Sequence, residues 1–168
     1  MVLGMTTFTF IHVLISLVAI LSGLVVLYGL YTADRMPAWT AIFLVLTVAT
    51  SVTGFGFGFH GVTPAIVLGV LSLLVLAPTI AGRYAFHLAG PWRWVYVVGA
   101  VVALDFNVFV LIVQAFQKVP ALHALAPTGS GPVFAAAQGA ALVFFVVAGV
   151  LGFRRFHPAV AMIPLPVV

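Results

Sequence analysis

The chain of 168 residues contains no cysteine and no glutamate, and only 5% of its residues are charged. The lack of cysteine excludes disulfide bonds, iron–sulfur clusters, thiolate zinc sites and cysteine nucleophiles. Because Asp34 and Asp105 are the only acidic residues, a relay of several carboxylates is excluded as well. Soluble domains carry about 25% charged residues, and two acidic and six basic side chains are too few to cover a water-exposed surface of this size.

Long apolar runs dominate the chain: 65% of its residues are hydrophobic, and the mean hydropathy is +1.36. Such runs are typical of membrane-spanning helices. Four of them begin at a proline, which is favoured in the first helical position because its missing N–H has no partner there. We predict an all-α integral membrane protein, a single bundle of five transmembrane helices with short loops. The predicted spans cover residues 7–31, 37–59, 64–88, 91–117 and 132–153.

The bundle is expected to occupy residues 1–157, and residues 158–168 form a proline-rich apolar tail. In the longest loop, residues 120–126 are a candidate for a short interfacial helix. Pro78, in the middle of the third span, predicts a kink that frees a backbone carbonyl. Small residues on one face of a helix allow close packing in a membrane, and in the second span these are Thr40, Thr47, Ser51, Gly54 and Gly58.

Charged and aromatic residues indicate the same orientation. Of the six Lys and Arg residues, only Lys118 falls on the side opposite the others. All Trp and Tyr residues, Tyr96 included, fall near the five arginines, as in an interfacial aromatic belt. The positive-inside rule makes this side cytoplasmic, so the N-terminus is predicted outside and the C-terminus inside. The stretch from Asn107 to Thr128 resembles small bacterial membrane proteins, which implies a multi-pass protein of the bacterial inner (plasma) membrane.

Asp105 is the one formal charge at mid-depth in the predicted bundle. A charge there costs at least about 2.5–3.5 kcal/mol, and no Lys or Arg lies at its depth. We therefore expect a neutral, hydrogen-bonded acid. One interpretation is a proton carrier or cation ligand. The alternative is a structural hydrogen bond to a hydroxyl such as that of Thr47, Thr50 or Ser72.

A second group of polar residues gathers near the predicted outer side. Asn107, Gln114 and Lys118 recur at intervals of seven and four residues, which places them on one face of the fourth helix. Gln138 and His12 are expected near the outer ends of the fifth and first helices. The pattern predicts a small outward-facing vestibule that binds or passes a solute or a proton. The alternative is that the amides fasten the fourth helix to the fifth while the histidines lie in interfacial water.

Three histidines on the outer side suggest two further interpretations. His12, His60 and His123 lie on separate elements, and no pair has the spacing of two metal ligands on one helix. No cofactor is predicted, and haem b, held by His12 and His60, or a divalent metal is kept as an alternative. The run Phe55-Gly-Phe-Gly-Phe, which ends at His60, could meet an apolar ligand such as a quinone.

A basic group lies at the predicted inner side. Arg83 and His87 are four residues apart, and Arg93 follows the next loop. These three residues could hold an anionic lipid headgroup, and the alternative is ordinary topogenic charge whose side chains extend to the interface. The chain has no basic stripe that would bind nucleic acid. Its partners are therefore expected in the membrane: the lipid bilayer itself, and a second copy or a larger membrane complex.

Three functions follow from these patterns. The first is binding or permeation of a small solute or proton through the outward vestibule, with Asp105, Asn107, Gln114, Gln138 and His12 as working groups. The second is a non-catalytic accessory subunit of a larger membrane complex. The third is a small haem- or quinone-binding redox protein. No catalytic residue is assigned, because the chain lacks the motifs of nucleotide-binding, metalloprotease and serine-hydrolase sites.

Overall fold

The computed structural model describes residues 6–57 and 63–157, and this part of the chain is helical without strands. The five long helices are α1 (Thr7–Thr32), α2 (Pro37–Gly54), α3 (Pro64–Ile80), α4 (Trp92–Lys118) and α6 (Pro132–Arg155). A 3-10 turn, η1 (Phe55–Phe57), continues α2, and a π-helical turn, η2 (Ala81–Ala85), continues α3. The short helix α5 (Pro120–Leu125) lies between α4 and α6. Each of the five long segments has the length and hydropathy to cross a membrane.

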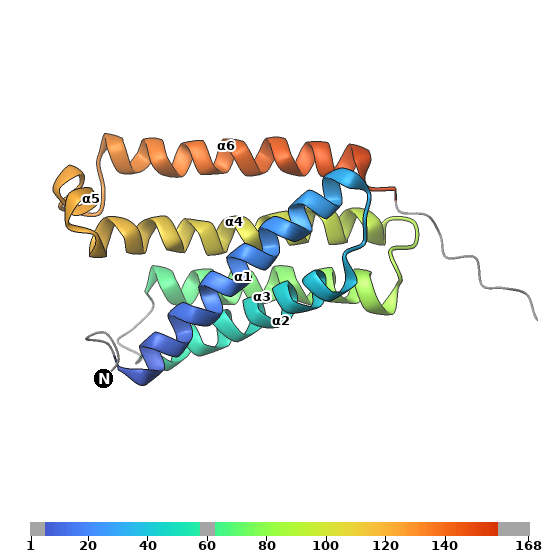
Figure 1. Ribbon diagram of the computed structural model, residues 1–168, viewed down its shortest axis with the longest axis horizontal. Coiled ribbons are helices and arrows are strands. Elements are labelled where there is room, and N and C mark those ends of the chain that lie inside the picture. Colours follow the sequence, from blue (N-terminus) through green and yellow to red (C-terminus); the bar gives the residue numbers. More distant parts are fainter. Residues whose placement is uncertain (1–5, 58–62, 158–168) are drawn as a thin grey trace, which may run out of the picture.

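The long helices run alternately up and down, so their connections fall at two ends (Figure 1). One end holds the α1–α2 loop, the η2–α4 connection and the last turn of α6, and it carries all five arginines. We call this the basic end. The other end, called here the opposite end, holds the start of α1, the end of α4 with Lys118, and α5. The predicted separation of charge is therefore present in the fold.

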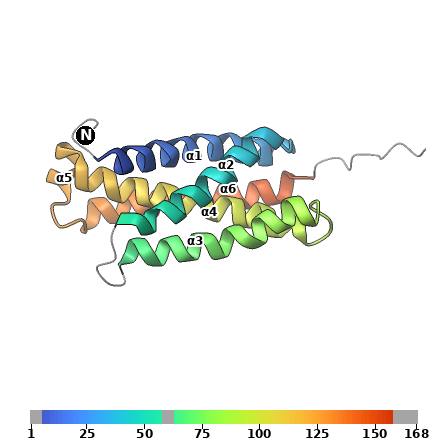
Figure 2. The same cartoon turned by 90° about the horizontal axis from the view of Figure 1, so that it is seen from below.

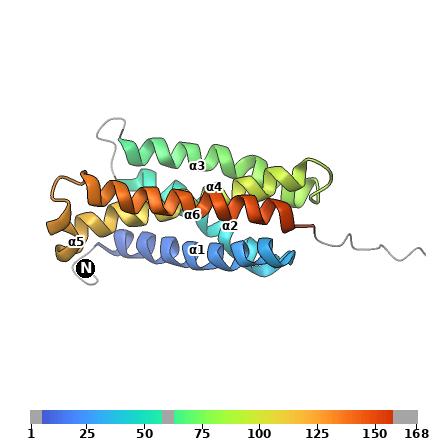
Figure 3. The ribbon, with the colours of Figure 1, turned by 90° about the horizontal axis from the view of Figure 1, so that it is seen from above.

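Helix α4 lies at the centre of the bundle. It contacts α1, α3, α5 and α6, and it is the most buried of the five long helices. Figure 3 shows α6 in front of α4, whereas Figure 2, from the other side, shows α2 in front with α1 and α3 to either side. Helix α6 contacts α1 and α4 and is the least buried. The two sides of α4 thus face different neighbours.

Small residues mark the close helix contacts, as predicted. Thr40, Thr47 and Ser51 are buried in the interior face of α2. In α6, a Cβ added to Gly152 would lie 3.3 Å from the Cβ of Leu30. Because lipid supplies no hydrophobic drive between helices, such close backbone approach is a main source of packing energy in a membrane. Gly58, the fifth residue of the predicted α2 stripe, lies outside the described residues.

The main differences from the predicted spans occur at the helix ends. The second helix ends at Gly54 and continues as a 3-10 turn, and α3 changes to a π-helical turn after Ile80. Pro78 cannot donate to the carbonyl of Leu74, and three residues later the helix widens, with the Phe86 N–H bound to the Ala81 carbonyl at 2.9 Å. Interruptions of this type are known causes of helix distortion. The sequence predicted that Pro78 would leave a backbone carbonyl without its helical donor, but it did not predict the π-helical turn.

The aromatic belt needs one correction. Tyr96 was expected at the membrane interface, but only 1% of its surface is exposed. Its position on α4 points its ring into the bundle, where it packs among α2 and η2 side chains. Five of the other aromatic residues at the basic end are well exposed, as a belt requires: Tyr28, Tyr31, Trp39, Tyr84 and Trp94.

Candidate functional site

Hydroxyl groups on α2 connect this helix to three neighbours along most of its length. We call this set the α2 seam. Its α2 members are Thr40, Thr47, Thr50, Ser51 and Thr53, and their partners are Tyr96, Asn107, Ser16, Ser72 and His12. From Thr40 to Thr53 the seam covers about 20 Å along the helix axis. The repeated small hydroxyls therefore serve as cross-links as well as points of close approach.

His12 lies at the opposite end of the seam. Its Nδ1 is 2.8 Å from the Thr53 hydroxyl, which itself donates to the Ala49 carbonyl at 2.7 Å. Because the Thr53 proton is used in that bond, the histidine Nδ1–H is the donor to Thr53. The imidazole also meets the Phe57 ring edge-on, with centroids 4.8 Å apart. His12 is thus held in the α1–α2 interface.

Two hydrogen-bonded pairs form the middle of the seam. The Asn107 amide donates to the Thr47 hydroxyl at 3.2 Å, and the Ser51 hydroxyl donates to Ser72 at 3.0 Å. Thr47, Ser51 and Ser72 are all buried. Hydrogen bonds of this kind between membrane helices contribute about 0.6 kcal/mol on average. Asn107 therefore fastens α4 to α2, whereas Gln138 is the amide that makes the predicted contact between α4 and α6.

The basic end of the seam contains a buried arginine that sequence reasoning assigned to topology or lipid. Arg83 is 8% exposed, donates to the Arg35 carbonyl at 2.8 Å, and lies over the Tyr96 ring at 5.4 Å. Thr40 also donates to the Arg35 carbonyl, at 3.1 Å, and its oxygen lies 3.3 Å from that of Tyr96. Within the described part of the chain, the buried Arg35 Nε–H has no partner. One feature of the sequence pointed to the burial of Arg83. It follows Thr79 by four residues and so shares its helix face, and Thr79 is fully buried.

The other residues of the predicted lipid group have partners of their own. Arg93 donates to the Phe156 carbonyl at 2.6 Å and to that of Phe153 at 3.3 Å, and so closes the C-terminus of α6. His87 is exposed, with a left-handed backbone at φ 49°. Arg83 and Arg93 therefore stabilise different parts of the fold, and neither guanidinium is left without a protein contact.

The residues of the predicted vestibule occupy separate interfaces. His12 binds α2, Asn107 binds α2 from α4, and the Gln138 amide donates to the Phe109 carbonyl of α4 at 3.2 Å. Gln114 and Lys118 are exposed on α4. His123 in α5 places its Nδ1 3.3 Å from the Phe116 carbonyl. The structure thus brings these residues to one half of the bundle but pairs most of them locally.

The predicted histidine sites lie partly outside the described residues. His60 lies outside the described residues, so its pairing with His12 stays a prediction. Within residues 6–57 and 63–157, no three or more His, Cys, Asp or Glu side chains form a group that could hold a metal ion. His12 keeps its Nε2 free of the seam contact made by Nδ1. Phe55 packs against Gly69 of α3, and Phe57 packs against α1.

Asp105 stands apart from the seam. Thirteen residues separate it from each end of α4, which places it about 20 Å from either end. It is four residues from both Val101 and Phe109, so the three share one face of the helix. Val101 contacts Gly149 of α6, and Phe109 receives the Gln138 amide of α6. Asp105 therefore lies along the α6 side of α4, about 160° away from Asn107.

The Asp105 side chain is partly exposed on that flank, near the exposed Val98 and Phe109. Among the described residues it has no hydrogen-bond partner. The hydroxyls predicted as its partners are bound elsewhere: Thr47 to Asn107, Thr50 to Ser16 and Ser72 to Ser51. Among the described residues the expected internal hydrogen bond is thus not formed, because Asp105 lies on the side of α4 opposite to Asn107, which faces the α2 seam.

Comparison with protein-family models, with curated protein sequences and with solved structures finds no match to this chain.

Proposed function

We propose that this chain is a multi-pass subunit of a bacterial inner-membrane complex and that it binds another membrane protein along the α6 side of α4. The observation that carries the proposal is the Asp105 carboxyl, which lies at the middle of α4 on a partly exposed flank without a partner in the described residues. An ionisable group at this depth is costly in lipid unless a protein group covers it. A second protein is the group best placed to do so.

The chain's own cations do not meet this need. All of its Lys and Arg residues fall in loops or in the first or last turns of the long segments, and the nearest along α4 are Arg93 and Lys118, each at least twelve residues from Asp105. We infer that the partner supplies a cation at mid-membrane, from a transmembrane Lys or Arg side chain. A second copy of this chain would offer no cation at that depth, so the proposal commits to a different protein.

The α2 seam supports the same conclusion. His12 and Asn107, which would have lined the predicted vestibule, are used to hold α1, α2 and α4 together. The polar interior thus has a structural role, and Asp105 is left as the ionisable group at mid-depth that faces outward. With the positive-inside rule, the basic end is proposed to lie in the cytoplasm and the Thr7 end of α1 outside.

Proton or small-solute binding is the second candidate, and one observation favours it. A partly exposed carboxyl that lacks an internal partner could take up and release a proton or coordinate a cation, as intramembrane acids often do. In that case Asp105 would work with lipid or water beside it and would need no second protein. Haem or quinone binding stays a prediction that depends on His60.

Two variants of Asp105 separate these functions. The tagged chain is purified in mild detergent from membranes of its source, as wild type, Asp105→Asn and Asp105→Leu, with Gln114→Leu as a control that alters an exposed polar residue of the same helix. Under the subunit proposal, Asp105→Leu releases the co-purifying partner and Gln114→Leu retains it. Asp105→Asn keeps an acceptor oxygen but loses the charge, so it should retain the partner only in part. Full retention in both Asp105 variants, with loss of proton or solute uptake into vesicles, would instead establish the second candidate.

The orientation has its own test, because the chain has no cysteine to remove. Ser130→Cys and His157→Cys place single thiols at the opposite end and the basic end. We expect an impermeant maleimide to label intact cells at position 130 and not at 157. Labelling at 157 alone would reverse the proposed orientation.

A further inference from the structure

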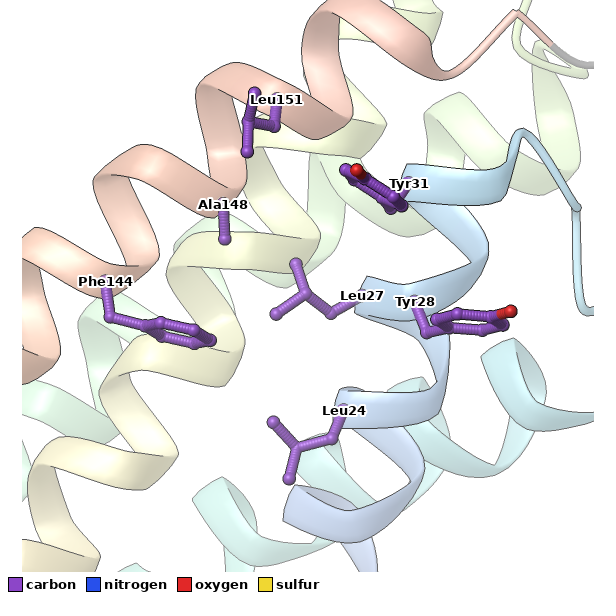
Figure 4. Close-up of a pocket in the computed structure, with 7 residues that line it drawn as sticks. All are labelled: Leu24, Leu27, Tyr28, Tyr31, Phe144, Ala148 and Leu151. Atoms are coloured by element: carbon purple, nitrogen blue, oxygen red, sulfur yellow. The ribbon is translucent and has the colours of Figure 1, made fainter.

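An apolar groove separates α1 from α6 in the half of the bundle nearest the basic end. It has a volume of about 310 Å³, and Figure 4 shows Leu24 and Leu27 of α1 on one wall and Phe144 and Ala148 of α6 on the other. From Tyr31 to Leu24 it extends for two helical turns, about 10 Å. Because α1 and α6 are outer helices and most of their side chains that line the groove are exposed, the groove opens sideways toward the membrane.

The rim of the groove is amphipathic. Tyr28 and Tyr31 stand where α1 approaches the basic end, the level at which tyrosines meet lipid headgroups. The Arg155 guanidinium lies over the Tyr31 ring, 4.0 Å from its centroid. Stacking of this kind leaves the N–H edges of the guanidinium available for a planar or phosphate acceptor. The one acid at this end, Asp34, accepts from the Met36 N–H at 3.0 Å.

We propose that this groove binds an anionic phospholipid of the leaflet at the basic end, with one acyl chain between α1 and α6 and the phosphate on Arg155. The apolar walls match the chain, the tyrosines match the interfacial level, and the exposed guanidinium matches the negative headgroup. This differs from the Arg83, His87 and Arg93 group predicted from the sequence, and it does not rest on the proposed subunit function.

A second groove provides an internal comparison. It lies between α2 and α3, has a larger volume of about 420 Å³, and includes Val45, Val48 and Tyr84 in its lining. Arg83, the neighbour of Tyr84 in sequence, is buried and bound to the Arg35 carbonyl. The second groove therefore matches an acyl chain in shape, but Arg83 is bound to the Arg35 carbonyl and is not available to a lipid phosphate. Selection for anionic headgroups is expected at the α1–α6 groove alone.

The test is native mass spectrometry of the purified full chain after delipidation and addition of phosphatidylglycerol or phosphatidylcholine. We expect about tenfold tighter binding of phosphatidylglycerol, because both lipids offer a phosphate to Arg155 but the choline ammonium of phosphatidylcholine is repelled by the guanidinium. Arg155→Gln should remove this preference, while the adjacent Arg154→Gln keeps it. Ala148→Phe, which fills the groove and leaves the charge in place, should weaken both lipids at this site.

Three results would overturn the proposal. Equal losses in Arg154→Gln and Arg155→Gln would show attraction to the whole basic end and no built site. Unchanged binding in Ala148→Phe would place the lipid outside the groove. Competition by inorganic phosphate as strong as that by the lipid would show that the acyl chain contributes nothing. Thermal unfolding of each variant without lipid confirms that it is folded.

Discussion

The two sides of α4 are built with different chemistry. Toward α2 it presents Asn107 and Tyr96, and both form hydrogen bonds to hydroxyls of α2. Toward α6 it presents Val101, which packs against Gly149, and Asp105, which has no partner in the described residues. The difference separates polar groups that hold the chain together from a polar group that the chain leaves available. The side of α4 that faces α2 therefore stabilises the fold, whereas the Asp105 side is the one available to bind another molecule.

The largest loss of stability is expected at Gly99, where α4 and α3 approach each other very closely. A Cβ at Gly99 would overlap the hydroxyl of Thr79, which is fully buried and donates to the Val75 carbonyl at 2.6 Å. Gly99→Val should therefore destabilise the protein by about 3 kcal/mol. In contrast, a Cβ at Gly139 of α6 meets nothing within 4 Å, so Gly139→Val should change the unfolding free energy by less than about 0.5 kcal/mol. Thermal unfolding in detergent measures both, and equal losses would remove the contrast between the two sides.

Asp105→Leu is the next largest effect, and its sign is unusual. In the chain purified alone, the substitution replaces an unpartnered polar group among apolar surroundings, and we expect the unfolding free energy to rise by about 1–2 kcal/mol. The same change should weaken the complex in the source membrane. A loss of stability in the isolated chain would mean that Asp105 has an internal partner. It would contradict the placement of its side chain on the partly exposed α6 side of α4.

The α2 seam should show pairwise coupling. Thr47→Val leaves the Asn107 amide without its acceptor, and we expect a loss of about 1 kcal/mol. Asn107→Leu should cost a similar amount, and the double variant should cost less than the sum, with a coupling energy of about 0.6 kcal/mol. The measurement is a double-mutant cycle from unfolding curves. Strict additivity would show that the 3.2 Å contact does not stabilise the fold.

The smallest effect is expected for the polar contact on the α6 side. The Gln138 amide reaches the Phe109 carbonyl at 3.2 Å, in an exposed position. Gln138→Leu should lower stability by no more than about 0.5 kcal/mol, because water or lipid headgroups can replace the bond. A loss as large as that of Thr47→Val would show that α6 is fastened by hydrogen bonds in the same way as α2.

The five spans could be predicted because each is a long apolar run with a proline or a loop at its boundary, a property of the local sequence. The small-residue face of α2 was predicted from spacing for the same reason, and Thr40, Thr47 and Ser51 are buried as expected. The short helix of the α4–α6 loop was also confirmed, at Pro120–Leu125. These features need no knowledge of which helix packs against which.

The partners of the polar residues could not be predicted, because they depend on helix order in space. The amides were expected to join the fourth span to the fifth, and Gln138 does so, but Asn107 binds α2 instead. Tyr96 was assigned to the membrane interface, yet it is buried against Thr40 and Arg83. A helix face can be read from spacing, but its neighbour is set by how all five helices pack. The free flank of Asp105 became visible only when those neighbours were known.

The most direct test of the account is site-specific photo-crosslinking in membranes of the source cell. A photoreactive residue at Phe109 lies on the Asp105 flank, and one at Val45 lies on the exposed face of α2 as a control. We expect a discrete adduct with another protein from position 109, none from position 45, and loss of the adduct in Asp105→Leu. An adduct only with a second copy of this chain, or equal yields from both positions, would contradict it.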